Sequence, residues 1–341
     1  MNNKFFMAAI SATCIMTGAA GALAQEWQPD RPINIIVPWS AGGSTDQVTR
    51  VVAPILEEAL GQPVVVVNQP GASGATGTQA VLDAPRDGYT WTANAIANNA
   101  TYAVTGLVPN SSIEDYQVYL SVANIPVVSV HPDAPWQDMG ELLEAMRSDD
   151  PPTVATAGVN SSGGMALAAI NEASGGEGRM ISYDGGGPAT IATAGGEAQV
   201  TTQLAVEQAE LIKGGKLRPL AALSDQPLEI EGIEEPIPPI TQWLPDMHVA
   251  LDYFGILIPV GAPQEVYDTV DRIWEEDVMT SEALRNYALE RGAVFAPAYG
   301  EEAMEKAMPV IISEACARVD RGEAVVPPSE FGIDCETMTA E

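Results

Sequence analysis

The stretch Ile35–Arg50, "IIVPWSAGGSTDQVTR", sets the pattern on which this chain is built. Its apolar start is typical of a buried strand, and the apolar positions that follow Thr45 recur at helical spacing until Gly61. Gly42 and Gly43 stand between them and allow unusual backbone torsions. The order of strand, glycine turn and helix predicts a βα unit.

The same order recurs along the chain. "PVVVVN" and "YTWTANAIA" predict two further strands, separated by a glycine-rich turn and a short helix. A second series of strands, glycine- or serine-rich turns and helices follows. We therefore predict an α/β protein with two open α/β domains and a ligand cleft between them, where strand-to-helix turns converge. The expected boundaries are 25–124 with 225–341 for lobe 1 and 125–224 for lobe 2.

The N-terminus predicts a targeting segment. Lys4 precedes an apolar, small-residue stretch that ends in Ala22-Leu23-Ala24. This is typical of a secretory signal peptide, residues 1–24, cleaved after about Ala24. A retained anchor is the alternative, although glycine and threonine dilute the segment. Cys14 lacks the preceding aliphatic residue that lipid attachment would need.

Composition excludes several classes of protein. Hydrophobic residues make up 46% of the chain, which argues against disorder. With 15 Lys and Arg against 46 Asp and Glu, the formal charge is −31, which opposes binding to nucleic acid and to anionic lipid. The acidic residues are scattered along the sequence, so we expect an acidic, halophilic-type surface suited to high salt.

Cysteine and motif usage argue against metal, cofactor and enzyme chemistry. After signal cleavage Cys316 and Cys335 remain, and in an exported protein they are expected to form a disulfide, with two free thiols as the alternative. No CxxC, HExxH or Asp-rich calcium loop occurs, so we expect no metal and no cofactor. Gly71, Gly74 and Gly77 have GxxGxxG spacing rather than a dinucleotide fingerprint, and no GK[ST] or GxSxG motif occurs. The chain is therefore predicted not to be an enzyme.

The glycine turns are candidate anion sites. Free N–H groups at a helix start attract an anion by roughly 0.3–1 kcal/mol, and hydroxyls such as those of Ser40, Ser44 and Thr45 add donors. In the alternative interpretation Asp46 only caps the helix and the glycines only turn the chain. Similar chemistry recurs in "GVNSSGG" and "YDGGGPAT", residues 158–164 and 183–190, and Asn94 follows the third strand as an amide donor or an ordinary loop residue.

Four segments resemble one family. They are "RPINIIVPWSAGGSTDQVTRVVAPILEEALGQPVVVVNQPGASGATGTQAV", "DGYTW", "ISYDGGGPATIATAGGEAQV" and "IKGGKLRPLAALS". With "FGILIPVGAPQEV" the likeness spans about Arg31 to Ala298. The chain resembles the periplasmic solute-binding proteins of tripartite tricarboxylate transporters, also called Bug proteins.

The resemblance implies a two-lobed periplasmic-binding-protein (Venus-flytrap) fold, expected to be a monomer in the periplasm. Such a protein captures a small organic acid and delivers it to membrane permease subunits. The ligand class is a di- or tricarboxylate, an amino acid or an aromatic carboxylate. Presentation of the ligand to a membrane signalling kinase is the alternative role. Asp184 departs from the family pattern, which argues against citrate and leaves open a ligand amine.

Together, the turns and the resemblance indicate one set of ligand-binding candidates, listed here in chain order. They are Ser40, Ala41, Gly42, Gly43, Ser44, Thr45, Asp46, Asn94, Asn160, Ser161, Ser162, Tyr183, Gly186, Pro188, Gln203 and Phe254.

Overall fold

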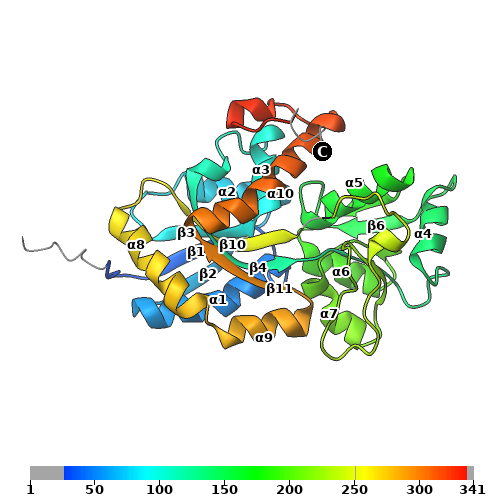
Figure 1. Ribbon diagram of the computed structural model, residues 1–341, viewed down its shortest axis with the longest axis horizontal. Coiled ribbons are helices and arrows are strands. Elements are labelled where there is room, and N and C mark those ends of the chain that lie inside the picture. The colour runs from blue at the N-terminus through cyan, green and yellow to red at the C-terminus, as the bar shows by residue number, and fades with distance from the viewer. Residues whose placement is uncertain (1–26, 250, 336–341) are drawn as a thin grey trace, which may run out of the picture.

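The structure is a computed structural model that describes residues 27–249 and 251–335. The predicted signal peptide lies outside these residues. Figure 1 shows two α/β units side by side, each built on one sheet. Among the described residues, no helix has both the length and the apolar character needed to cross a membrane.

The first unit is built on a six-stranded sheet in the order β11-β4-β10-β3-β1-β2. β1 pairs in parallel with β2 and β3, whereas β10 runs antiparallel to both β3 and β4. β11 closes the other edge, antiparallel to β4. The strands are β1 (Ile33–Val37), β2 (Val64–Asn68), β3 (Thr90–Ala95), β4 (Tyr116–Asn124), β10 (Asp252–Pro259) and β11 (Val294–Tyr299).

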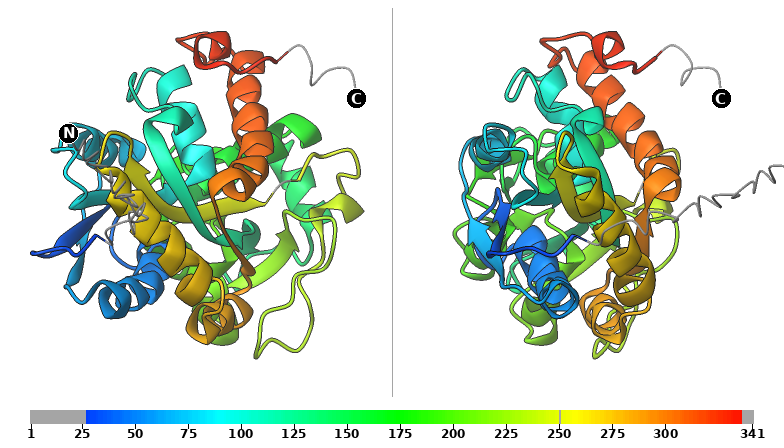
Figure 2. Two further views of the ribbon diagram at one scale, coloured as in Figure 1. Left: turned by 60° about the vertical axis from the view of Figure 1, so that its left-hand side comes forward. Right: turned by 90° about the vertical axis from the view of Figure 1, so that its left-hand side faces the viewer.

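Helices cover both faces of this sheet. Buried side chains of α1, α8 and α9 form one core with β1 and β3, and those of α2, α3 and α10 form a second core with β4. Figure 2 shows α10, in orange, lying beside α3. The helices are α1 (Ser44–Leu60), α2 (Ala75–Leu82), α3 (Ile96–Val104), α8 (Gln264–Ile273), α9 (Glu282–Arg291) and α10 (Gly300–Asp320).

The second unit is built on a five-stranded sheet in the order β7-β6-β8-β5-β9. α4 and α5 share one core with this sheet, and α7 shares another. The strands are β5 (Val127–Val130), β6 (Thr153–Thr156), β7 (Arg179–Ser182), β8 (Val200–Thr201) and β9 (Arg218–Ala222). The helices are α4 (Met139–Met146), α5 (Ser162–Ser174), α6 (Gly186–Ala194) and α7 (Ala205–Lys213).

The chain passes between the units twice. It leaves the first sheet at Asn124, enters the second at Val127, and returns with Asp252 at the start of β10. Residues 225–249, which the expected boundaries assign to lobe 1, place Leu228 and Leu244 in the cores of the second unit. We therefore propose that lobe 2 extends to about residue 249.

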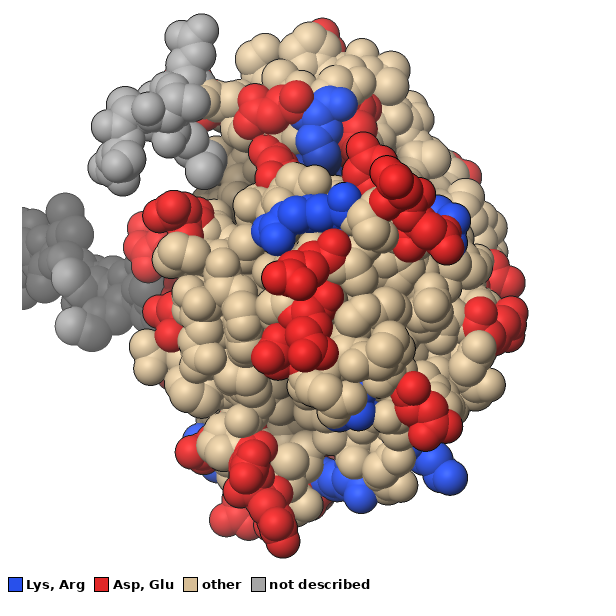
Figure 3. Space-filling model, turned by 90° about the vertical axis from the view of Figure 1, so that its right-hand side faces the viewer, with Lys and Arg blue, Asp and Glu red and all other residues tan. Residues whose placement is uncertain are grey.

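The surface carries many acidic side chains, and the two cysteines near the C-terminus are bonded to each other. Asp and Glu side chains are spread over the face shown in Figure 3, with Lys and Arg among them. Cys316 of α10 forms a disulfide with Cys335, with their Cα atoms 5.5 Å apart. This bond attaches the last described residues to the helix that precedes them.

Candidate functional site

A narrow cavity lies where turns from the two sheets meet. Its volume is about 20 Å³, which leaves room for about one water molecule. The turns at its walls follow β1 in the first unit and β6, β7 and β8 in the second, and β10 adds an aromatic ring. The lining residues are Trp39, Gly43, Ser44, Thr45, Asn98, Ala157, Ser161, Ser162, Gly186, Gln203, Leu204, Glu207 and Phe254.

The first wall is the turn between β1 and α1. Gly42 has φ +84°, a left-handed conformation that favours glycine. Gly43 is the N-cap of α1 and has no side chain to cap the helix, so Ser44 is the first helical residue. The amide N–H of Ser44 therefore points out of the helix end and is free to bind an acceptor from elsewhere.

Asp46 stabilises this turn from within the same unit. Its Oδ2 accepts the amide N–H of Gly42 at 2.9 Å, and its Oδ1 accepts Nε of Arg50 and Nδ2 of Asn68, each at 2.9 Å. Burial acts to raise the pKa of Asp46, but these hydrogen bonds and the charge of Arg50 outweigh it and lower the pKa. Asp46 is thus a charged group that holds the turn, and both its oxygens are occupied.

Glu207 of α7, in the second unit, provides the acceptor for Ser44. Its Oε1 accepts the amide N–H of Ser44 at 2.8 Å, and its Oε2 accepts that of Leu204 at 3.2 Å. When the side-chain amide of Gln203 is oriented so that its oxygen and its nitrogen both form hydrogen bonds, the nitrogen donates to the same Oε2 at 3.1 Å. Burial raises the pKa of Glu207 to about 6, although the bonds from Ser44 and Leu204 act to lower it. A carboxylate therefore already lies at the N-terminus of α1.

The turn before α5 forms much of the opposite wall. Ser161 caps α5, accepting the amide N–H of Gly164 at 3.1 Å and donating to the carbonyl of Gly158 at 2.7 Å. Asn98 of α3 donates to the backbone carbonyl of Asn160 at 2.5 Å and so joins the two units. The Oδ1 of Asn160 is buried and finds no hydrogen-bond partner in the described part of the chain.

The structure brings half of the predicted ligand-binding residues to this cavity. Gly43, Ser44, Thr45, Ser161, Ser162, Gly186, Gln203 and Phe254 line it. Tyr183 lines a neighbouring hollow of about 220 Å³. The remaining predicted residues lie outside the lining of the cavity: Ser40, Ala41, Gly42, Asp46, Asn94, Asn160 and Pro188.

Two of those outer residues, Ser40 and Asn94, support the turns. Ser40 donates its amide N–H to the carbonyl of Asp184 at 3.3 Å, which joins the first glycine turn to the turn before α6. Asn94 is fully buried, where it accepts the indole N–H of Trp39 at 2.9 Å and donates to Asn99 at 2.9 Å. These contacts hold the walls of the cavity in place.

Sequence reasoning missed Glu207 and Trp39 as cavity residues. Glu207 lies in the first turn of α7, where an acidic residue is favoured by the helix dipole alone. No local pattern distinguishes that role from an interlobe contact. Among the described residues that line the cavity there is no lysine or arginine, so amide N–H groups, side-chain amides and hydroxyls are the hydrogen-bond donors that they offer.

Comparison with known proteins places the chain in a family. The family model described as the tripartite tricarboxylate transporter family receptor matches residues 48–292. Protein BugT of Bordetella pertussis is 30% identical over 305 residues, covering 84% of this chain and 89% of BugT.

Solved structures share the fold. That of the periplasmic binding protein BugD has a TM-score of 0.77 at 24% identity, covering 87% of this chain and 99% of BugD. MatC of Rhodopseudomonas palustris with bound malate has a TM-score of 0.72 at 21% identity, with 86% and 98% covered. Rpa4515 of R. palustris with adipate has a TM-score of 0.73 at 22% identity, covering 89% of this chain and 98% of Rpa4515. The two-lobed fold predicted from the sequence is confirmed, and the chain belongs to the tripartite tricarboxylate transporter receptor family, which includes the Bug proteins.

Proposed function

We propose that this protein captures a small organic carboxylate between its two lobes and delivers it to the permease subunits of a tripartite tricarboxylate-type transporter. One observation carries the proposal: the amide N–H of Ser44, at the start of α1, holds the carboxylate of Glu207 at 2.8 Å. Since the N-terminus of α1 already binds the carboxylate of Glu207, it is suited to bind the carboxylate of a ligand. MatC and Rpa4515, which bind malate and adipate, support the ligand class.

The ligand carboxylate replaces Glu207 at Ser44 in this proposal. The cavity has room for about one water molecule, so a dicarboxylate enters only when the Glu207 side chain leaves or the lobes separate. Hinge closure then buries the ligand between the glycine turns. The predicted cavity residues Gly43, Ser44, Thr45, Ser161, Ser162, Gly186, Gln203 and Phe254 form the contact set, and the protein acts in the periplasm after export.

A proline substitution tests the helix end directly. Ser44→Pro removes the donor N–H, while the first helical position tolerates proline and the extended Gly43 (ψ 169°) suits the residue before a proline. Ser44→Ala removes the hydroxyl and keeps the amide. Glu282→Pro is the matched control. It also places a proline at the first position of a helix, α9, after the extended residue Ser281, but it lies outside the lining of the cavity.

Isothermal titration with malate, adipate and an amino-acid panel in high salt measures the outcome. A hydrogen bond to a charged group contributes about 1.5–3 kcal/mol, so Ser44→Pro should weaken carboxylate binding by about tenfold or more. Glu282→Pro should bind like the unsubstituted protein. Folded protein that binds no carboxylate, or Ser44→Pro with unchanged affinity, would contradict the proposal.

A further inference from the structure

A second, larger cavity lies on another side of the contact between the units. Its volume is about 350 Å³, within the range of small-molecule sites. Helix α5 and residues 246–249 line it from the second unit, and α10 and Asp252 line it from the first. Ser162 is the residue that it shares with the lining of the narrow cavity.

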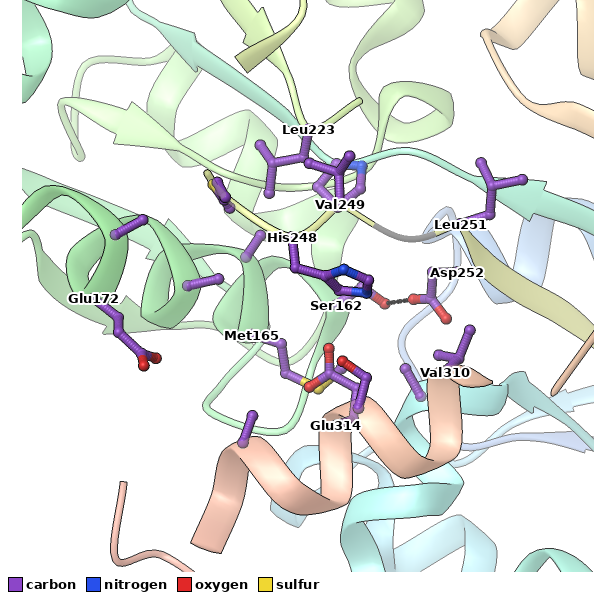
Figure 4. A pocket seen from close by; sticks show the side chains of 18 of the residues that line it. Ser162, Met165, Glu172, Leu223, His248, Val249, Leu251, Asp252, Val310 and Glu314 are labelled. Carbon is purple, nitrogen blue, oxygen red and sulfur yellow. Dashed lines mark hydrogen bonds between the residues drawn. The ribbon is translucent and has the colours of Figure 1, made fainter. Parts of the chain in front are cut away.

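Acidic side chains converge in this cavity. Asp252 enters from β10 and Glu314 from α10, and Figure 4 shows both carboxylates beside His248. Glu172 and Asp246 are exposed at its margin. Arg321 is the one arginine or lysine among the described lining residues. Its Nε pairs with Glu323 at 3.3 Å and its Nη1 with Glu172 at 3.9 Å, while its Nη2 is buried and has no hydrogen-bond partner within the described residues.

Asp252 is the strongest indication of a ligand. It is 6% exposed, and its Oδ2 accepts the hydroxyl of Ser162 at 2.5 Å. Its Oδ1 is buried and has no hydrogen-bond partner within the described residues. Burial raises the pKa of Asp252 to about 7, and the negative charge of Glu314 adds to this, although hydrogen bonds from Ser162 and from the backbone of Ala97 act to lower it. An unpaired buried carboxylate oxygen is costly, and a cation would offset that cost.

The rest of the lining indicates what kind of cation fits. No group of three or more His, Cys, Asp or Glu among the described residues is arranged to hold a metal ion. Much of the rest of the lining is apolar, although His248 and Ser313 also belong to it. The apolar lining residues include Met165, Ala166, Leu223, Val249, Leu251 and Val310. An ammonium group on an alkyl chain matches both features, with the charge at the two carboxylates and the chain along the apolar walls.

We propose that this cavity is a second binding site, for an organic ammonium compound, and that Asp252 and Glu314 bind its charged group. Such a ligand would touch both units at once. The site is separate from the proposed carboxylate site, because its lining includes neither Ser44 nor Glu207.

Titration of the full mature chain with hexylammonium chloride at low salt tests the site. The expected result is saturable binding with one site per chain, with no binding of hexan-1-ol, which has the same alkyl chain and no charge. Glu314→Gln should weaken hexylammonium binding by at least about tenfold, because a charge-assisted hydrogen bond is lost. Glu305→Gln, an exposed position on the same helix outside the cavity lining, should change it by less than about twofold. If Glu314→Gln fails to fold, Asp252→Asn carries the same expectation as Glu314→Gln.

Three results would overturn the proposal: no saturable hexylammonium binding, equal binding of hexan-1-ol, or equal effects of Glu314→Gln and Glu305→Gln. Malate titration on the same protein keeps the two sites distinguishable. If the protein binds malate but not hexylammonium, only the ammonium-site proposal is contradicted. If it binds hexylammonium but not malate, only the carboxylate-site proposal is contradicted.

Discussion

Ser44 and Glu207 lie 163 residues apart in the sequence, and the amide N–H of Ser44 donates to Oε1 of Glu207 at 2.8 Å. This contact joins α1 of the first unit to α7 of the second. It places a negative charge at the end of a helix whose dipole favours anions. The same charge competes with any carboxylate ligand that approaches that end.

Glu207→Gln should increase the affinity for carboxylates. Glutamine keeps the length of the side chain and an oxygen for Ser44, but removes the negative charge that repels the ligand. Loss of one close like-charge interaction of about 1–2 kcal/mol corresponds to an affinity gain of about fivefold to thirtyfold. Isothermal titration with malate and adipate at pH 7.5 measures it.

Glu210→Gln is the matched control, because it removes a charge from the same helix at a largely exposed side chain outside the cavity lining. It should leave the affinity near that of the unsubstituted protein. A fall in affinity for Glu207→Gln alone would mean that Glu207 binds a donor group of the ligand rather than competing with it.

Gly43→Val should impair ligand binding more than stability. Gly43 has φ −74° and ψ 169°, which a valine adopts without strain. A Cβ there would lie 3.4 Å from Oε1 of Glu207 and 3.4 Å from the carbonyl of Ser40, which is ordinary contact. The remaining valine atoms then occupy space that the ligand needs. Thermal unfolding with and without malate separates the effects, since a ligand raises the melting temperature only where it binds. Equal losses of stability and affinity would favour a purely structural turn.

The turn before α1 could be predicted from sequence because its determinants are local. An apolar strand, two glycines and helix-capping residues stand within Ile35–Asp46, and the structure has β1 and α1 on either side of them. The turns before α5 and α6 were predictable in the same way, because glycines and serines follow an expected strand in each. What each side chain does in those turns depends on residues far away in sequence.

The roles of Asp46 and Glu207 could not be predicted from the sequence around them. Whether Asp46 meets a ligand or only its own turn depends on Arg50 and on Asn68, which belongs to the next strand. Glu207 reaches the cavity only because the second unit packs against the first, and no sequence spacing encodes that distance. The Oδ1 of Asp252, which has no hydrogen-bond partner within the described residues, was likewise not predictable, because Asp252 lies where the chain returns to the first unit at the start of β10.

Asp252→Asn should alter the pH dependence of stability. The pKa of Asp252 is about 7 in the folded protein against an ordinary value of 3.8, so the folded state holds this proton more tightly than the unfolded state. Asp252 therefore destabilises the fold progressively as pH rises from about 4 to about 7. Asparagine, which does not titrate, removes this effect.

The stability of Asp252→Asn relative to the unsubstituted protein should accordingly rise between pH 4 and pH 8, by about 2–4 kcal/mol. Urea unfolding at a series of pH values measures the difference. Asp246→Asn, which removes a carboxylate at the exposed margin of the same cavity, is the matched control. A flat difference for Asp252→Asn would show that Asp252 has an ordinary pKa.

Loss of the disulfide should destabilise the fold and leave carboxylate binding unchanged. The bond joins Cys316 to Cys335 across a sequence separation of 19, and Phe331 and Ile333 within that loop pack on the core beneath α10. Closing a loop of this size stabilises a protein by about 3 kcal/mol, mainly by restricting the unfolded chain. Cys316→Ala with Cys335→Ser should therefore lower the free energy of unfolding by about 2–4 kcal/mol. The unsubstituted protein treated with a reductant should show a similar loss of stability. Malate titration should give the same affinity for both proteins, because no described residue after Phe254 lines the narrow cavity. A large fall in malate affinity would mean that the C-terminal loop supports the cleft.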